Sequence, residues 1–159
     1  MLKQVMIIVT ILFFVVGCSQ KRDINFSQPY KIVLKTKDLA IADGGFLTKA
    51  DNYKSIEVFS AGKILLHIEL DSSACINGSC TNRLDFNSRV FGYSYYKSFL
   101  DDLLDKKAIY NGVNKMKING GFEQKIKTKG YDILYRVTDK TTYFKDRQNH
   151  ILIKLKKLK

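Results

Sequence analysis

The sequence predicts an α+β domain in which an antiparallel, curved β-sheet packs on one main amphipathic helix. Three observations favour this class. Apolar and polar residues alternate with period two along most of the chain, turn-forming dipeptides separate the alternating runs, and residues 93–107 alone have a clear helical period. This order of elements, with strands followed by one helix and then by further strands, is typical of α+β domains.

The first half of the domain is predicted to consist of strands joined by tight turns. Asp43-Gly44-Gly45 breaks the pattern as a turn, and Ala61-Gly62 closes a hairpin. The predicted strands span residues 30–36, 39–42, 54–60, 63–70 and 83–91. In the first of them, Ile32 and Leu34 share one face and the lysines take the other.

The segment 93–107 is predicted to be the helix, because an apolar stripe recurs at helical spacing. The stripe comprises Tyr96, Leu100, Leu103 and Leu104, and Asn111-Gly112 follows as a stop signal. We interpret the stripe as core packing, because apolar helix faces of this kind are usually buried. A ligand-binding box is the alternative interpretation.

The second half returns to period-two alternation. A hairpin about Gly120-Gly121 is followed by three further strands. The predicted strands span residues 113–119, 122–128, 131–138, 142–145 and 150–158.

The N-terminal stretch has the pattern of a secretory signal. Lys3 precedes an apolar run from Val5 to Gly17, which is short for a membrane-spanning helix. Val15-Val16-Gly17-Cys18 resembles the lipobox of bacterial lipoproteins, with Val15 in place of the commoner Leu. The resemblance implies cleavage before Cys18 and a cysteine carrying two or three acyl chains, which give stable membrane anchoring.

The same resemblance sets the expected location and domain boundaries. Ser19 stands where an Asp commonly retains such lipoproteins in the inner membrane. The outer membrane is therefore expected, on its periplasmic face, with the inner membrane as the alternative. The expected organisation is a cleaved signal peptide over 1–17, the acylated Cys18 and a short tether over 18–29, and a single periplasm-facing domain over 30–159.

Once Cys18 is acylated, Cys75 and Cys80 remain as an even pair in a compartment that permits disulfides. The Asn77-Gly78 step between them favours a tight turn, which would bring the thiols together. A local disulfide is the expectation. Two free thiols or a redox pair are the alternatives, although a redox site normally has a two-residue spacer and this spacer has four.

Positive charge is concentrated in the last third of the chain. Residues 18–105 hold 11 basic and 11 acidic side chains, whereas residues 106–159 hold 15 basic against four acidic ones, a net charge of +11. Several of the lysines alternate with apolar residues, so that each predicted strand presents lysines on one face. This set comprises Lys115, Lys117, Lys125, Lys127, Lys129, Lys154 and Lys156.

If these strands are neighbours, one face of the sheet is a field of lysines. The functional interpretation is an anionic partner, either a lipid head group, lipopolysaccharide, peptidoglycan or an acidic envelope protein. The alternative is a solvated face whose lysines discourage edge-to-edge pairing of strands. Nucleic acid is disfavoured as a partner because of the export signal.

The sequence contains no recognisable catalytic or metal-binding motif. His67 and His150 are isolated, Asp43 and Asp51 lack the spacing of a calcium loop, and neither a serine elbow nor a phosphate loop is present. We therefore expect no catalytic residues, no metal and no cofactor.

The hypothesis that follows is a non-enzymatic envelope lipoprotein, anchored through Cys18, which binds another envelope component through its basic sheet face. The alternative is a lipid or lipoprotein carrier that resembles the Lol-type localisation factors, in which a curved antiparallel sheet wraps helices around an apolar cavity. An apolar cavity of a few hundred Å³ between sheet and helix would favour the carrier. A cell-wall or lipid enzyme is the third hypothesis.

Overall fold

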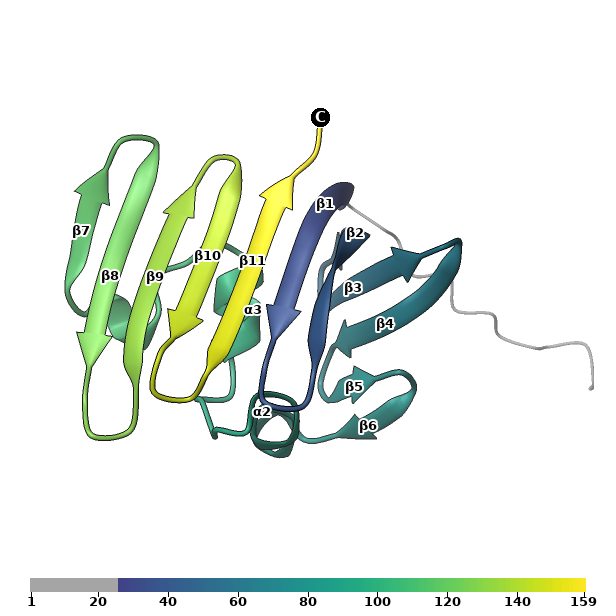
Figure 1. Cartoon of the computed structure of the whole chain (residues 1–159), viewed down its shortest axis with the longest axis horizontal. Helices are drawn as coiled ribbons and strands as arrows, with labels where there is room; N and C mark the ends of the chain where they lie inside the picture. Colours follow the sequence, from purple (N-terminus) through teal and green to yellow (C-terminus); the bar gives the residue numbers. More distant parts are fainter. Residues whose placement is uncertain (1–25) are drawn as a thin grey trace, which may run out of the picture.

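The computed structural model describes residues 26–159, and the lipobox at Val15–Cys18 lies outside the described residues. A single antiparallel sheet of eleven strands dominates the fold, in the order β6-β5-β4-β3-β2-β1-β11-β10-β9-β8-β7 (Figure 1). The helices of the described part are short. The fold is therefore closer to a β-rich class than to the predicted sheet with one main helix.

The sheet is built from two meanders that meet in its middle. Consecutive strands pair from β1 through to β6 and again from β7 through to β11, and β11 pairs with β1, which leaves β6 and β7 at the two edges. The strands are β1 (Phe26–Lys35), β2 (Ala40–Ala50), β3 (Tyr53–Ser60), β4 (Lys63–Leu70), β5 (Ala74–Ile76), β6 (Ser79–Thr81), β7 (Lys115–Ile118), β8 (Gly121–Lys127), β9 (Asp132–Thr138), β10 (Thr141–Asp146) and β11 (Ile151–Lys157).

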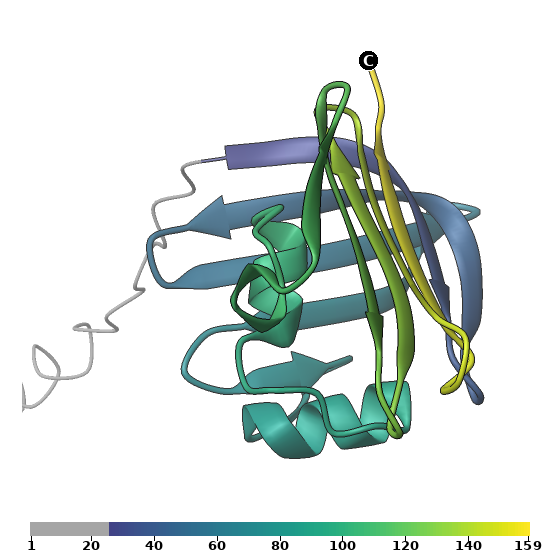
Figure 2. The same cartoon turned by 90° about the vertical axis from the view of Figure 1, so that its left-hand side faces the viewer.

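The sheet is curved, and both helices lie on its concave side. Helices α2 (Arg83–Phe91) and α3 (Phe99–Leu104) belong to the connection between the two meanders, together with a 3₁₀ turn (Tyr110–Gly112). Figure 2 shows α3 between the β3 to β5 side and the β8 to β10 side of the sheet, and α2 across the lower end of the space between them. The predicted curvature of an antiparallel sheet is consistent with this arrangement.

Two of the predicted tight turns are confirmed. Ala61 and Gly62 join β3 to β4 with φ values of 47° and 77°, and Asn77 and Gly78 join β5 to β6 with φ values of 48° and 81°. Positive φ at both central residues matches the right-handed twist of the flanking strands.

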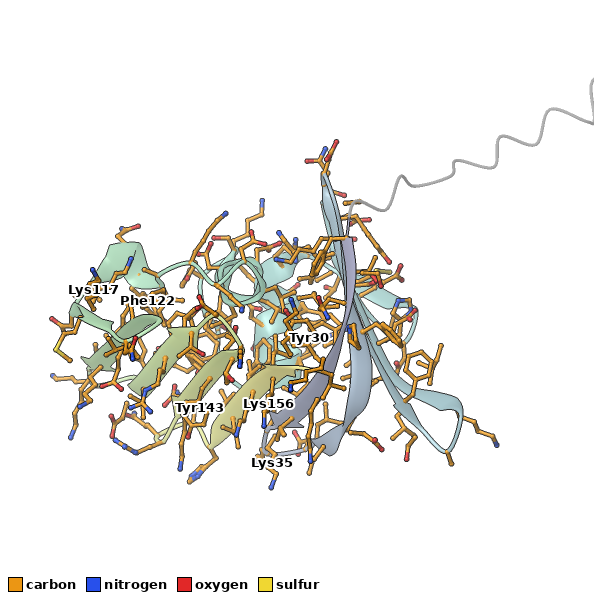
Figure 3. The ribbon with its side chains drawn as sticks, turned by 90° about the horizontal axis from the view of Figure 1, so that it is seen from above. Tyr30, Lys35, Lys117, Phe122, Tyr143 and Lys156 are labelled. Atoms are coloured by element: carbon orange, nitrogen blue, oxygen red, sulfur yellow. A yellow bond between two sulfur atoms is a disulfide. The ribbon has the colours of Figure 1, made fainter. Side chains whose placement is uncertain are left out.

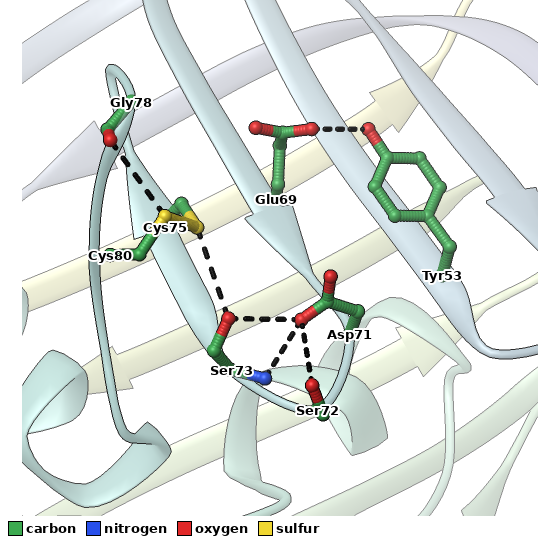
Figure 4. Close-up of a disulfide and its surroundings, with 8 residues drawn as sticks. All are labelled: Tyr53, Glu69, Asp71, Ser72, Ser73, Cys75, Gly78 and Cys80. Carbon is green, nitrogen blue, oxygen red and sulfur yellow. Dashed lines mark hydrogen bonds between the residues drawn. A yellow bond between two sulfur atoms is a disulfide. The ribbon is translucent and has the colours of Figure 1, made fainter. Parts of the chain in front are cut away.

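The disulfide between Cys75 and Cys80 is present, as expected. The two cysteines face each other across β5 and β6, so that the bond crosslinks two very short strands (Figure 4). Asp71 supports the preceding turn, because its Oδ1 accepts hydrogen bonds from the backbone N–H and the hydroxyl of Ser73 at 2.8 and 3.0 Å. The disulfide hairpin is thereby fixed at one end of the sheet.

The turn predicted at Asp43-Gly44-Gly45 is wrong, because these residues lie inside β2. Gly45 marks a close approach of two backbones. A Cβ atom at this position would lie 2.1 Å from the carbonyl oxygen of Glu57 on β3 and 2.7 Å from the side chain of Ile32. Glycine is therefore required here by packing, and the strand continues through it.

The strand predicted over 83–91 is also wrong, because this segment forms α2. Asn82 caps the helix, and its Oδ1 accepts hydrogen bonds from the backbone N–H groups of Leu84 and Asp85 at 3.1 and 3.0 Å. Gly92 ends it in the left-handed conformation, with φ 68°. Both residues are ordinary helix boundary signals, which outweigh the short alternation between them.

The helix predicted over 93–107 is confirmed only over Phe99–Leu104. Leu100, Leu103 and Leu104 are buried, which confirms the core interpretation for these members of the stripe. Residues 93–96 are not helical. The Asn87 side chain holds this segment, because its Nδ2 donates hydrogen bonds to the carbonyl oxygens of Tyr95 and Tyr96 at 3.1 and 3.0 Å.

Aromatic rings fill the space between α3 and the concave face of β10. The rings of Tyr95 and Phe99 stack with their centroids 4.1 Å apart, and Phe144 of β10 lies 5.0 Å from Phe99 and 5.7 Å from Tyr95. All three side chains are at most 1% exposed. This aromatic cluster is the centre of the core, and it attaches the short helix to the sheet.

A buried carboxylate lies beside this cluster. The Tyr95 hydroxyl donates to Asp146 Oδ2 at 2.7 Å, Asn149 Nδ2 donates to the same oxygen at 2.7 Å, and the backbone N–H of Asp132 donates to Oδ1 at 3.1 Å. Burial would raise the pKa of Asp146, but these hydrogen bonds outweigh burial and hold the pKa below its ordinary value. Asp146 is thus a structural ion that fixes the β10–β11 turn.

Replacing Tyr95 with Phe should lower the free energy of unfolding by about 1–2 kcal/mol, because the buried carboxylate loses one donor. The folded-state pKa of Asp146 lies below its unfolded value, so its charge contributes stability above the unfolded pKa and this contribution is lost as pH falls through the folded pKa. The cost of Tyr95→Phe should therefore shrink in acid. Urea unfolding between neutral and acid pH measures both effects.

Tyr143→Phe is the matched control, because Tyr143 lies on the convex face of β10, where none of the described hydrogen bonds involves its hydroxyl. Equal losses of stability for the two variants would contradict the structural role of the bond between Tyr95 and Asp146.

Candidate basic interface on the convex face of the sheet

Residues that face each other in an antiparallel sheet lie on the same side of it, so the register shows which lysines share a face. One row crosses five strands, from Lys125 to Leu134, Lys145, Leu152 and Lys35. These side chains lie on the convex face, because the intervening residues of each strand point into the core. Basic and aliphatic side chains therefore alternate across this row.

Two further rows run parallel to the first. One contains Arg136, Tyr143, Lys154 and Val33, and the next brings Lys156 opposite Lys31. Figure 3 shows Lys35, Tyr143 and Lys156 on the side of the sheet that faces away from the helices. We define the basic convex surface by Lys31, Lys35, Lys125, Lys127, Arg136, Lys145, Lys154 and Lys156.

The seven lysines predicted from the sequence do not all share this face. Lys115 and Lys117 face Gln124 and Phe122, on the concave side, and the Lys115 ammonium lies 4.5 Å from the centre of the Phe122 ring. A two-residue hairpin turn pairs odd-numbered residues of β7 with even-numbered residues of β8, which separates Lys115 and Lys117 from Lys125. Lys129 lies in the turn between β8 and β9.

The tertiary structure adds four cations that the sequence did not connect with the others, Lys31, Lys35, Arg136 and Lys145. Lys31 and Lys35 come from the first strand, and they join the surface only because β1 pairs with β11. Arg136 and Lys145 lie on the strands between β8 and β11. The alternation of polar and apolar residues around Arg136 and Lys145 was visible in the sequence, but the residues that face them on adjacent strands were not.

The acidic residues of this region are already paired with cations. Glu123 is 6% exposed and is bound by the Arg136 guanidinium, with an Nε to Oε2 distance of 2.8 Å, and by the Lys125 ammonium at 3.3 Å. Hydrogen bonds from Arg136 hold the pKa of Glu123 below its ordinary value. Asp132 lies 3.6 Å from the Arg147 guanidinium. These acids leave much of the positive charge uncompensated.

Within residues 26–159, Lys31, Lys35, Lys145 and Lys156 form no ion pair with a carboxylate. Lys31 and Lys156 even face each other directly across β1 and β11. Like charges that face each other across two strands lower the stability of a sheet. A neutral side chain at either position would remove this repulsion.

The surface is suited to broad contact with an extended anion. Leu134, Tyr143 and Leu152 are half-buried between the cations, so that the lysine stems cover apolar area and their ammonium groups reach solvent. A shallow hollow of about 190 Å³ lies at one end, lined by the cations Lys125, Lys127 and Arg147 together with Asp132. A single phosphate-sized group would fit there.

A second charged cluster has a structural role. Lys54 lies 3.0 Å from Asp101 and 3.3 Å from Asp105, and Lys49 lies 3.0 Å from Asp105. Burial disfavours the charge of Asp105, but these lysines outweigh burial and lower its pKa. The cluster attaches α3 to the ends of β2 and β3. It borders an open surface cavity of about 700 Å³ that also receives Arg83.

The histidines are not brought together. His67 lies on β4 with its Nε2 3.6 Å from Glu57 Oε1, whereas His150 lies in the turn before β11. Glu69, which shares a face with His67, accepts a hydrogen bond from the Tyr53 hydroxyl at 2.9 Å. Among the residues that the structure describes, no group of three or more His, Cys, Asp or Glu side chains is arranged to hold a metal ion.

Comparisons with known proteins found no match from which a function could be inferred. No protein-family model matches the chain, and no curated protein matches it significantly. In the described part of the chain, none of the helices has the length and apolar character needed to cross a membrane.

Replacing Lys31 with Glu should raise the free energy of unfolding by about 0.2–1 kcal/mol, because it converts a facing pair of like charges with Lys156 into an opposite-charge pair. Lys63→Glu is the control, since Lys63 is exposed and faces the neutral Ser60 across β3 and β4. Both variants change the net charge equally. Urea unfolding should separate them, and an equal change in both would contradict local repulsion at Lys31.

Proposed function

We propose that this protein is a non-enzymatic envelope lipoprotein, anchored through Cys18, that binds an anionic envelope component through its basic convex surface. The partner would be lipid, lipopolysaccharide, peptidoglycan or an acidic envelope protein. The outer membrane is the proposed location, on the periplasmic side.

The observation that carries this proposal is a set of cations on one sheet face that have no carboxylate partner within residues 26–159. Lys31 and Lys156 face each other at a cost in stability, which favours a role for their charge outside the fold. Each lysine close to an anionic surface contributes about 1 kcal/mol of binding free energy. Several of them in adjacent rows would therefore give useful affinity.

The anchoring part of the proposal rests on the lipobox resemblance of Val15-Val16-Gly17-Cys18. The disulfide between Cys75 and Cys80 supports an oxidising compartment outside the cytosol, where such bonds persist. The anchor would keep the domain close to anionic components of the envelope and so raise their effective concentration. A moderate affinity would then suffice for binding.

A carrier that resembles the Lol-type localisation factors is the second candidate. The observation that favours it is the curved antiparallel sheet around two helices. Against it, Tyr95, Phe99 and Phe144 pack in direct ring contact where a carrier would hold its lipid. The basic convex surface therefore supports partner binding better than the concave side supports cargo binding.

The test compares two double variants of the full chain, reconstituted in neutral vesicles. Lys35→Gln with Lys145→Gln removes two cations of the basic convex surface, whereas Lys115→Gln with Lys117→Gln removes two cations from the other face. Binding is measured to added lipopolysaccharide, to peptidoglycan sacculi and to vesicles of phosphatidylglycerol.

The first variant should weaken binding to the true partner class by about 30-fold, which corresponds to about 2 kcal/mol, and added salt should weaken it further. The second variant should retain most of the affinity. Equal losses of binding for both variants would overturn the proposal.

A further inference from the structure

Pro29 and Tyr30 of β1 lie beside the last residues of β11 at one end of the sheet, and the start of β1, at Phe26, extends beyond them along β2. Tyr30 faces Lys157, and the backbone N–H of Leu158 donates to the Pro29 carbonyl at 3.0 Å. The N–H of Lys157 donates to the Lys140 carbonyl at 2.8 Å, so the turn between β9 and β10 joins the same end. Figure 1 shows the C-terminus and the start of β1 toward the same end of the sheet, and Figure 2 shows that they are separated along the direction hidden in Figure 1.

This end combines exposed apolar side chains with lysines. Phe26 is 40% exposed and Leu158 is 41% exposed. Lys140, Lys157 and Lys159 are exposed as well, and Lys157 and Lys159 are the chain neighbours of Leu158. We define these five residues as the tether rim. The acidic residue next to these lysines is Asp139, which precedes Lys140 in the chain. The Lys106 ammonium donates a hydrogen bond to the backbone carbonyl of Asp139 at 2.7 Å.

The tether rim is also the place from which the chain leaves toward Cys18. Residues 19–25 separate Cys18 from Phe26, and a fully extended chain of this length spans at most about 28 Å. A bilayer that holds the acyl chains of Cys18 would therefore lie within that distance of Phe26. No other end of the sheet is connected so closely to the expected anchor.

We propose that the tether rim rests on the anionic bilayer to which Cys18 is attached, with Phe26 and Leu158 in the head-group region and the rim lysines on lipid phosphates. The inference rests on the proposed lipoprotein anchor and adds the surface that contacts the lipid. Exposed apolar side chains at the same end of the sheet as several lysines match this boundary, because apolar groups gain by leaving water and lysines gain by approaching lipid phosphates.

Docking through the tether rim also fixes the orientation of the domain. The basic convex surface lies on the broad face of the sheet, whereas the tether rim lies at the ends of its strands (Figures 1 and 3). A domain that stands on its tether rim directs the basic convex surface sideways, away from the lipid. The two basic surfaces would then serve two partners, the anchoring bilayer and a second envelope component.

The chain contains no tryptophan, so a single introduced tryptophan reports on one position without background. Leu158→Trp and Phe26→Trp place the reporter in the tether rim. Ile64→Trp is the control, because Ile64 is 53% exposed and apolar but lies at the far end of β4, away from the row in which Phe26 faces Lys49. Each full-length acylated variant is reconstituted in phosphatidylglycerol vesicles that contain brominated lipids.

The tether rim variants should show blue-shifted emission and several-fold stronger quenching by brominated lipid than Ile64→Trp. Adding Lys140→Gln, Lys157→Gln and Lys159→Gln to Leu158→Trp should reduce that quenching. Equal quenching at all three positions would overturn the inference. Mass spectrometry of the purified chain tests the anchor separately, since a chain without acyl groups would overturn the proposed lipoprotein itself.

Discussion

The pairing of β1 with β11 is the constraint on which the rest of the structure depends. It joins the first strand of the described chain to the last through six facing pairs, from Tyr30 and Lys157 to Lys35 and Leu152. The two meanders thereby become one continuous sheet. Closing so long a loop costs conformational entropy, which the burial of Ile32 and its partner Leu155 at the junction helps to offset.

The same junction creates the basic convex surface. Lys31 and Lys35 lie in a part of the sequence with balanced charge, and β1 carries them into contact with the basic strands of the last third. The positive charge of the surface is therefore a property of the fold, and the uneven charge distribution of the sequence accounts for only part of it. A partner would meet cations from four consecutive strands, β8 to β11, and from the distant strand β1.

The concave side shows a different use of polar groups. Asp146 is buried there, and several hydrogen-bond donors satisfy its carboxylate and keep it ionised. On the convex side, Lys35 and Lys145 have no carboxylate partner among the described residues. Buried charges must be paired because desolvation is costly, whereas exposed lysines are free to bind a partner. Glu123 follows the same rule on the convex side, because it is buried and is paired with Arg136 and Lys125.

Local patterns in the sequence identified most of the strands. Period-two alternation located β3, β4 and β8 to β11, and the Asn-Gly step between the cysteines indicated the disulfide hairpin. These features depend on residues close together in the chain, where the geometry of a turn or a strand is fixed by covalent connection. The two-residue turn between β7 and β8 also determines that Lys115 and Lys117 lie on the opposite face from Lys125, because it pairs odd-numbered with even-numbered residues.

Other features depend on contacts between distant segments, and the sequence could not supply them. Gly45 suggested a turn, but the approach of Glu57 and Ile32 requires a glycine inside a strand. Residues 93–98 have a helical period, but burial of Tyr95 against Phe144 holds them in a non-helical path. By itself the sequence determined the lipobox resemblance, the strand periodicity and the basic character of the last third. Only the tertiary structure decided which lysines share a face, because that depends on the β1–β11 register between opposite ends of the domain.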